Sequence, residues 1–197
     1  MNALQKNNIK SVFKYTWPLY IVIAVLVTLI INSIFTIIHQ IPSYQTLTIF
    51  ITGEVSDSNS LKSDLLEKFK DKGLRKVSTI DVYDNDVHYN TQLSINGYNS
   101  ADILIIPKTK LESLSSFSFA LELDEDLYDT YEVYEKESVR YGIQIDKEKV
   151  KKYMNLTNED CYMVLNGNSS NIGKYALKPN EEHDNALTLI KDWGKHA

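Results

Sequence analysis

The sequence predicts an α/β protein in which an N-terminal transmembrane helix is followed by one three-layer domain with a mostly parallel sheet. Three observations support this prediction. Residues 17–38 carry no Asp, Glu, Lys, Arg or His side chain. Short apolar runs and amphipathic segments then alternate over about 60 residues. The chain has 197 residues, so about 159 follow residue 38, a size typical of one domain.

The apolar run at residues 17–38 is long enough to form about 33 Å of helix and so to cross a bilayer. Three lysines precede it, and no Lys or Arg follows until Lys62. This charge asymmetry predicts a single-pass protein of the cell membrane, with residues 1–16 in the cytoplasm and residues 39–197 outside. A buried core helix would be amphipathic or flanked more closely by charge.

A cleaved signal peptide is the other alternative for this run. Its apolar region would be shorter, about 7–15 residues, and small residues would precede the cleavage point. Here the run ends in Thr-Ile-Ile-His-Gln, without such a pattern. We therefore expect an uncleaved signal anchor that contacts the lipid bilayer through residues 17–38. Residues 39–46 form a linker with a reach of roughly 25 Å, and residues 47–197 form the extracytoplasmic domain.

The charge balance of the outer domain is acidic. The whole chain has 21 basic and 26 acidic residues, and without the three N-terminal lysines 18 basic residues remain against 26 acidic ones. Such a surface disfavours nucleic acid as a partner, because affinity for nucleic acid depends on Lys and Arg at phosphates. The single cysteine excludes an intrachain disulfide, which in an exported domain points to a bacterium that does not rely on disulfides.

The first part of the domain alternates between two periodicities. Apolar, β-branched runs predict strands at residues 47–52, 77–83 and 101–106. Between them, helical spacing predicts a helix over residues 61–73, ended by a glycine, and a shorter one over residues 87–95. A β-α-β-α-β order implies parallel strands joined by right-handed crossovers.

The later part is less regular. A short helix is expected over residues 110–114, and the three-residue spacing of Tyr128, Tyr131 and Tyr134 suggests a helical turn. The remaining expected elements are two strands at 141–145 and 161–165, a charged connector or short helix at 146–160, and a terminal amphipathic helix at 181–193.

Several segments resemble extracellular solute-binding proteins of ABC importers, which have the type 2 periplasmic-binding-protein fold. The similar stretches are LTIFITGE followed by LLEKFKDKG, then Ala-Asp-Ile-Leu-Ile-Ile at 101–106, FALELDE at 119–125, Tyr-Gly-Ile-Gln at 141–144, Cys-Tyr-Met-Val-Leu-Asn at 161–166, and the terminal helix. The resemblance implies a substrate-binding or accessory component of an ABC-type importer. It also implies an ABC permease or another envelope protein as partner and a small solute, a sugar or a peptide, as ligand.

The size of the domain departs from that family. Its members usually clamp the ligand between two α/β lobes, and about 159 residues are too few for two lobes and a hinge. We therefore expect a chain shortened to about one lobe. The alternative is a protein-interaction scaffold of a cell-envelope complex that no longer binds a solute.

A ligand site in such a sheet is expected beyond the carboxyl ends of the parallel strands, where helix amino termini also point. The residues that follow the three predicted strands are the candidate ligand-binding residues: Thr52, Gly53, Glu54, Asp84, Asn85, Pro107 and Lys108. The alternative is that they are ordinary turn residues.

The sequence offers no pattern for catalysis. Residues 167–174 resemble a P-loop only loosely, because the spacing is one residue too long and Tyr175 replaces Ser or Thr. Residues 84–88 lack the glycine and glutamate of a calcium loop. No HExxH or G-x-S-x-G motif is present, and Cys161 lies in an apolar strand. We expect no enzyme, no cofactor and no metal, and the 13 tyrosines either stack on sugars, line an interface or fill the core.

Overall fold

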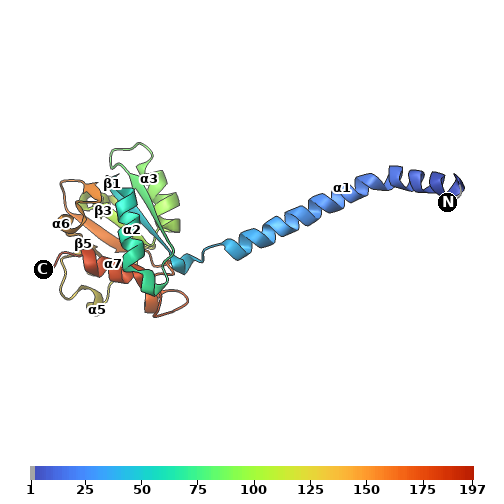
Figure 1. The fold of residues 1–197 in the computed structure, drawn as a ribbon. Helices are drawn as coiled ribbons and strands as arrows, with labels where there is room; N and C mark the ends of the chain where they lie inside the picture. The colour runs from blue at the N-terminus through green and yellow to red at the C-terminus, as the bar shows by residue number, and fades with distance from the viewer. Residues whose placement is uncertain (1–2) are drawn as a thin grey trace. The chain divides into compact units, whose positions relative to one another are not determined.

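The computed structural model describes the backbone of residues 3–197 and the side chains of residues 16–36 and 40–197. The chain divides into two compact units, one ending at Gln40 and the other comprising residues 41–197. Each unit is described by itself (Figure 1).

The first unit is a single helix, α1 (Ala3–His39). Its segment Thr16–Thr36 is long and apolar enough to cross a membrane, and none of it is buried. Three hydroxyls of this segment bond to the helix itself: those of Thr28, Ser33 and Thr36 each donate to a carbonyl four residues earlier at 2.8 Å. These bonds satisfy the hydroxyls without a partner helix, as a lipid environment requires. A helix of spanning length is therefore confirmed, while its orientation stays a prediction.

The second unit begins with the predicted β-α-β-α-β order. β1 (Thr46–Val55) lies between β2 (Lys76–Val82) and β3 (Ile103–Pro107), and both pairs are parallel. Alternate residues of β1 and β3 point to opposite faces, as in any strand, and each face meets a hydrophobic core.

The rest of the sheet is antiparallel, so the prediction of a mostly parallel sheet is wrong. The sheet has seven strands, with the order β2-β1-β3-β7-β5-β4 and β6 (Met154–Leu156) paired to β1. β7 (Cys161–Leu165) runs antiparallel to β3, β5 (Val139–Gln144) to β7, and β4 (Val133–Lys136) to β5. Connection length explains one of these pairs, because only a two-residue turn joins β4 to β5 and a parallel pair needs a crossover of a dozen residues or more.

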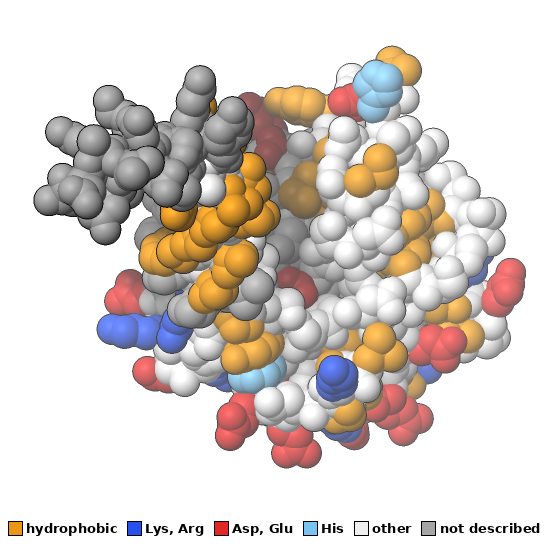
Figure 2. Space-filling model, turned by 90° about the vertical axis from the view of Figure 1, so that its right-hand side faces the viewer, with side chains coloured by type: hydrophobic (Ala, Val, Ile, Leu, Met, Phe, Trp, Pro, Cys, Tyr) orange, Lys and Arg blue, Asp and Glu red, His pale blue; other side chains and the backbone are white. Residues whose placement is uncertain are grey.

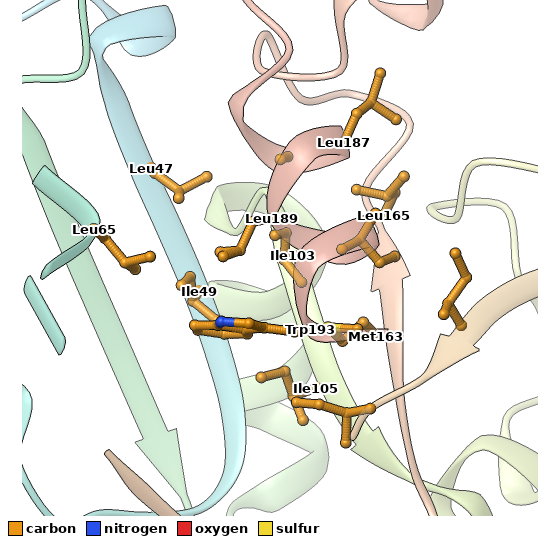
Figure 3. Close-up of a cluster of buried hydrophobic side chains, with 14 of the residues drawn as sticks. Leu47, Ile49, Leu65, Ile103, Ile105, Met163, Leu165, Leu187, Leu189 and Trp193 are labelled. Carbon is orange, nitrogen blue, oxygen red and sulfur yellow. The ribbon is translucent and has the colours of Figure 1, made fainter. Parts of the chain in front are cut away.

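The helices cover both faces of the sheet. α2 (Ser58–Lys68) and α7 (Asn185–Trp193) pack on one face, where they lie side by side (Figure 1) and are joined by an ion pair between Lys68 and Asp192. Figure 3 shows Trp193 of α7 lying over the strands close to Ile49 and Met163. On the opposite face pack α3 (Tyr89–Gln92), the π-helical turn Leu93–Tyr98, and α4 (Lys108–Ser113).

Local signals explain where the elements begin and end. The Asp57 carboxylate accepts a hydrogen bond from the Ser60 N–H at 2.9 Å and so caps α2. Gly73 has a left-handed backbone with φ 75° and ends the 3-10 turn Lys70–Lys72 that follows this helix.

The tyrosine-rich segment differs from its prediction. Only α5 (Glu125–Tyr128) is helical there, and Tyr134 belongs to β4. The expected connector at 146–160 contains α6 (Lys147–Val150) and β6. Three-residue spacing alone did not distinguish a helix from a turn followed by a strand.

Gly53 provides a test of the pairing between β1 and β6. Its φ of 147° is a conformation that side chains rarely adopt, and an added Cβ would lie 2.8 Å from the Asn155 carbonyl oxygen. We expect Gly53→Ala to lower the free energy of unfolding of residues 41–197 by about 2 kcal/mol, measured by urea denaturation. Gly167→Ala is the control, because the nearest atom there is 3.6 Å away. Equal stability of the two variants would contradict the requirement for glycine at position 53.

Candidate ligand-binding site

The predicted ligand residues at the end of β1 are engaged within the domain. Thr52 is fully buried, and its hydroxyl shares a hydrogen bond of 2.9 Å with the Tyr89 hydroxyl. Gly53 and Glu54 pair in antiparallel register with β6. β6 therefore extends along the carboxyl end of β1, although the Glu54 side chain is exposed.

The residues after β2 and β3 lie at the same edge of the sheet, as predicted, because these strands flank β1 in parallel register. Asp84 is half-buried and Asn85 is exposed. Pro107 is buried, and the Lys108 N–H donates to the Asp160 carbonyl at 2.8 Å. The structure thus brings the seven residues to one edge, and their binding of a ligand stays a prediction.

Two hollows lie instead around residues 115–118, Ser-Ser-Phe-Ser, which we call the serine loop. The first, here the lysine hollow, has a volume of about 340 Å³. The second, here the asparagine hollow, has a volume of about 330 Å³. Ser115, Ser116 and Ser118 line both, so the hollows adjoin along this loop.

The serine loop lies near the opposite end of the sheet from the predicted edge. The segment that follows the loop bonds to the end of β7: the Gly167 N–H donates to the Phe119 carbonyl at 2.8 Å, and the Leu121 N–H donates to the Leu165 carbonyl at 2.8 Å. Since β7 is antiparallel to β3, its end lies beside the start of β3.

Each hollow contains one stacked aromatic pair. In the lysine hollow the rings of Phe117 and Tyr141 stack with centroids 4.5 Å apart. In the asparagine hollow the rings of Tyr98 and Phe119 stack at 4.0 Å. In both pairs the phenylalanine is buried and the tyrosine is only half-buried. A fixed ring therefore supports a partly accessible one in each hollow.

Lys136 holds the serine loop against β4. Its ammonium group donates to the Leu114 carbonyl at 2.6 Å and lies 5.1 Å from the centre of the Phe117 ring. Both contacts satisfy the cation within the domain. Glu122 and Glu137 line the same hollow with exposed carboxylates.

Burial affects the tyrosine of the asparagine hollow. Desolvation raises the pKa of Tyr98 above its ordinary value of 10.0. Its hydroxyl is therefore neutral at physiological pH and retains both a donor and an acceptor function.

A backbone constraint lies at the rim of the lysine hollow. Glu137 and Ser138 form the two-residue turn between β4 and β5, with φ of 54° and 67°. Hairpin turns with two positive φ values normally use Asn and Gly. Non-glycine residues in a left-handed conformation are often found at functional sites.

A buried polar network organises the chain behind the hollows. The Asp102 carboxylate accepts hydrogen bonds from the Thr48 N–H at 2.7 Å, from the Ser169 hydroxyl at 2.5 Å and from the Asn171 amide at 3.1 Å. The same Asn171 amide reaches the Thr46 carbonyl at 2.8 Å. This network joins the start of β1, the start of β3 and the loop after β7.

The same loop fixes the asparagine hollow. The Asn166 amide donates to the Tyr98 carbonyl and to the Ala101 carbonyl, each at 2.8 Å. Two residues further, Asn168 lines the hollow with an exposed side chain. The loosely P-loop-like segment is therefore a polar structural loop that begins next to Asn166.

Two further cavities carry acidic linings. One, of about 590 Å³, is lined by residues 71–73 and 181–184. The other, of about 420 Å³, is lined by residues of α5 and the segment after it, including Glu125 and Asp126. Figure 2 shows one face of the molecule, on which acidic side chains gather along the lower border. Among the residues that the structure describes, no group of three His, Cys, Asp or Glu side chains is arranged to hold a metal ion.

Comparisons with known proteins add no identification: no family model, no curated protein and no solved structure significantly matches the chain. The similarity to solute-binding proteins therefore remains a prediction from short motifs.

Sequence reasoning missed the two hollows. It examined serine only for a G-x-S-x-G motif, and it treated the 13 tyrosines as one group. The available signal was the clustering of Ser and Phe at residues 115–119, but nothing in the spacing indicates that Tyr98 and Tyr141 stack on these phenylalanines, because each pair is distant in sequence.

The first prediction from this region concerns Asp102. Asp102→Ala leaves three donors, two of them buried, without their acceptor, and we expect a loss of about 3 kcal/mol in the free energy of unfolding. Urea denaturation of residues 41–197 measures it. Asp102→Asn keeps the shape of the side chain and should lose less.

The same carboxyl group predicts a pH dependence. Burial raises the pKa of Asp102 above 3.8, against the opposing effect of its hydrogen bonds. Because the native pKa exceeds the unfolded one, the stabilisation from this group is complete below the unfolded pKa and declines as pH rises through the native pKa. From about pH 4 upward, wild type should therefore lose stability relative to Asp102→Asn until the native carboxyl is fully ionised. A constant difference in the free energy of unfolding between wild type and Asp102→Asn across this pH range would contradict the raised pKa of Asp102.

The third prediction from this region concerns the strained turn. Ser138→Gly removes the side chain that disfavours a positive φ, so we expect it to raise the free energy of unfolding by about 1 kcal/mol. Ser63→Gly, in the middle of α2, is the control and should lower it by about 0.5–1 kcal/mol. Thermal denaturation distinguishes the two signs, and a destabilising Ser138→Gly would contradict the argument.

Proposed function

We propose that this chain is a membrane-anchored, extracytoplasmic module resembling a solute-binding protein, which serves as a substrate-binding or accessory component of an ABC-type importer. The observation that carries the proposal is the combination of an unburied helix of membrane-spanning length with a domain that opens on β-α-β-α-β. A tethered domain has a high effective concentration at a permease in the same membrane.

The proposed role is binding rather than catalysis. The rings of His183 and His196 stack on Tyr44 and Tyr131, with centroids 4.1 Å and 4.7 Å apart. These contacts engage both imidazoles away from the serine loop. Cys161 is buried, and desolvation raises the pKa of its thiol, which opposes formation of a nucleophilic thiolate.

A second candidate is a protein-interaction scaffold of a cell-envelope complex. One observation favours it, namely the internal engagement of the edge where a solute would be expected. Thr52 is buried, β6 pairs along the end of β1, and Lys108 bonds to Asp160. In this version the domain contacts another envelope protein without capturing a solute.

Membrane topology is the first test. Val87 is 93% exposed, whereas Cys161 is completely buried. A Val87→Cys protein should react in intact cells with a membrane-impermeant maleimide, because the proposal places the domain outside. Wild type is the matched control and should remain unlabelled, since its single cysteine is buried. Labelling only after cell lysis, or a mature chain that begins near Ile41, would contradict an extracytoplasmic domain held by an uncleaved anchor.

The partner distinguishes the two candidates. The full-length protein is cross-linked in its native membrane and purified, and its partners are identified by mass spectrometry. An ABC permease with its ATPase supports the importer component. Envelope proteins without a permease support the scaffold and contradict the importer.

A further inference from the structure

We propose that the lysine hollow and the asparagine hollow form one continuous groove that binds a neutral or amino-bearing saccharide of at least two sugar units. This inference deepens the proposed binding function and rests on it, but it assigns a site near the opposite end of the sheet from the edge that the sequence predicts.

The dimensions favour a short chain of repeating units. Each hollow has a volume of about 330–340 Å³, at the lower end of the range of small-molecule sites. The three serines that line both hollows place one immediately beside the other. A linear ligand with two similar units therefore fits better than one compact molecule.

The aromatic pairs give each hollow the same apolar element. A half-buried tyrosine backed by a buried phenylalanine occurs in both, with Tyr141 on Phe117 and Tyr98 on Phe119. Stacking against a buried ring restricts the motion of each tyrosine before any ligand arrives, which lowers the entropic cost of binding. A sugar ring has an apolar C–H face that can pack against such a ring.

The polar lining complements the edges of a sugar. Serine hydroxyls and the amides of Asn99 and Asn168 both donate and accept hydrogen bonds, as sugar hydroxyls do. The carboxylate oxygens of Glu122 and Glu137 accept hydrogen bonds, so they pair with donors such as hydroxyl or amino groups.

The charges exclude an anionic ligand. Lys136 is the basic residue of the lysine hollow, and its ammonium group is already bonded to the Leu114 carbonyl and placed over Phe117. The exposed side chains of Glu122 and Glu137 also line this hollow. They would repel phosphate, sulfate or a uronic acid, whereas a neutral sugar or an amino sugar avoids this repulsion.

The test uses the full-length protein in lipid nanodiscs. Calorimetry measures the binding of neutral and amino-bearing monosaccharides, of the corresponding short linear oligosaccharides, and of peptides and polyamines. Sedimentation with insoluble cell-wall polysaccharide distinguishes a structural glycan from a free sugar as the source of the ligand. We expect oligosaccharides to bind more tightly than monosaccharides, because only they occupy both hollows.

The variants locate the site. Tyr98→Ala and Tyr141→Ala should each weaken binding about tenfold through loss of stacking. Asn168→Ala and Glu122→Ala alter exposed lining side chains without opening the core, so weaker binding by these variants cannot be attributed to unfolding. Tyr83→Ala is the matched control, because Tyr83 is 53% exposed and lies after β2, outside both hollows.

Binding that weakens in the four hollow variants and not in Tyr83→Ala supports the groove. Saccharide binding that is lost in Tyr83→Ala or Asp84→Ala but kept in the hollow variants overturns it and leaves the proposed solute-binding function standing. Binding of peptides or polyamines without any saccharide also overturns the groove alone. If none of the tested ligands binds, both the groove and solute capture are overturned, and the protein-interaction scaffold is the candidate function that stands.

Discussion

A single buried carboxylate, that of Asp102, accepts hydrogen bonds from β1 and from the loop after β7, because it lies where β3 begins beside both. Its backbone adds two more links, since its N–H donates to the Thr48 carbonyl at 2.8 Å and its carbonyl accepts from the Asn166 N–H at 3.0 Å. A buried charge is costly unless several donors satisfy it. The surrounding chain is therefore held in one arrangement, because any shift of β1 or of this loop would leave the carboxylate unsatisfied.

The same constraint explains why the hollows are well defined although they lie among loops. Asn166 follows β7 directly and holds the carbonyl of Tyr98, so the tyrosine of the asparagine hollow is linked to the Asp102 network through one side chain. On the other side of the serine loop, Lys136 fixes the Leu114 carbonyl. The loop is thus supported at one end by Lys136 of β4 and at the other by the Gly167 N–H, which donates to the Phe119 carbonyl, and its three serines are exposed.

The sequence could predict those parts of the fold that depend on local pattern. The apolar run that includes Thr16–Thr36, the cap at Asp57 and the three parallel strands each arise from neighbouring residues, and the structure contains all three. The antiparallel half depends on which strands meet in space. The turn at Glu137 and Ser138 contains neither the Asn nor the Gly that would indicate a hairpin in the sequence. The sequence could not predict the candidate site either, because its aromatic pairs join residues that are 21 or more positions apart.

In the proposed groove, a ligand is bound by one domain alone, without a second lobe that closes over it. At the carboxyl ends of the strands, β6 pairs along the end of β1, and the Lys108 N–H donates to the Asp160 carbonyl. At the other end, the serine loop and the turn at Glu137 form two walls from within one domain, and buried phenylalanines provide the floor. A shallow groove of this kind does not enclose its ligand, so affinity must come from preorganised stacking and from contacts over several units rather than from closure. A repeating ligand satisfies that requirement, because each additional unit that reaches the adjoining hollow adds contacts without a further loss of translational freedom.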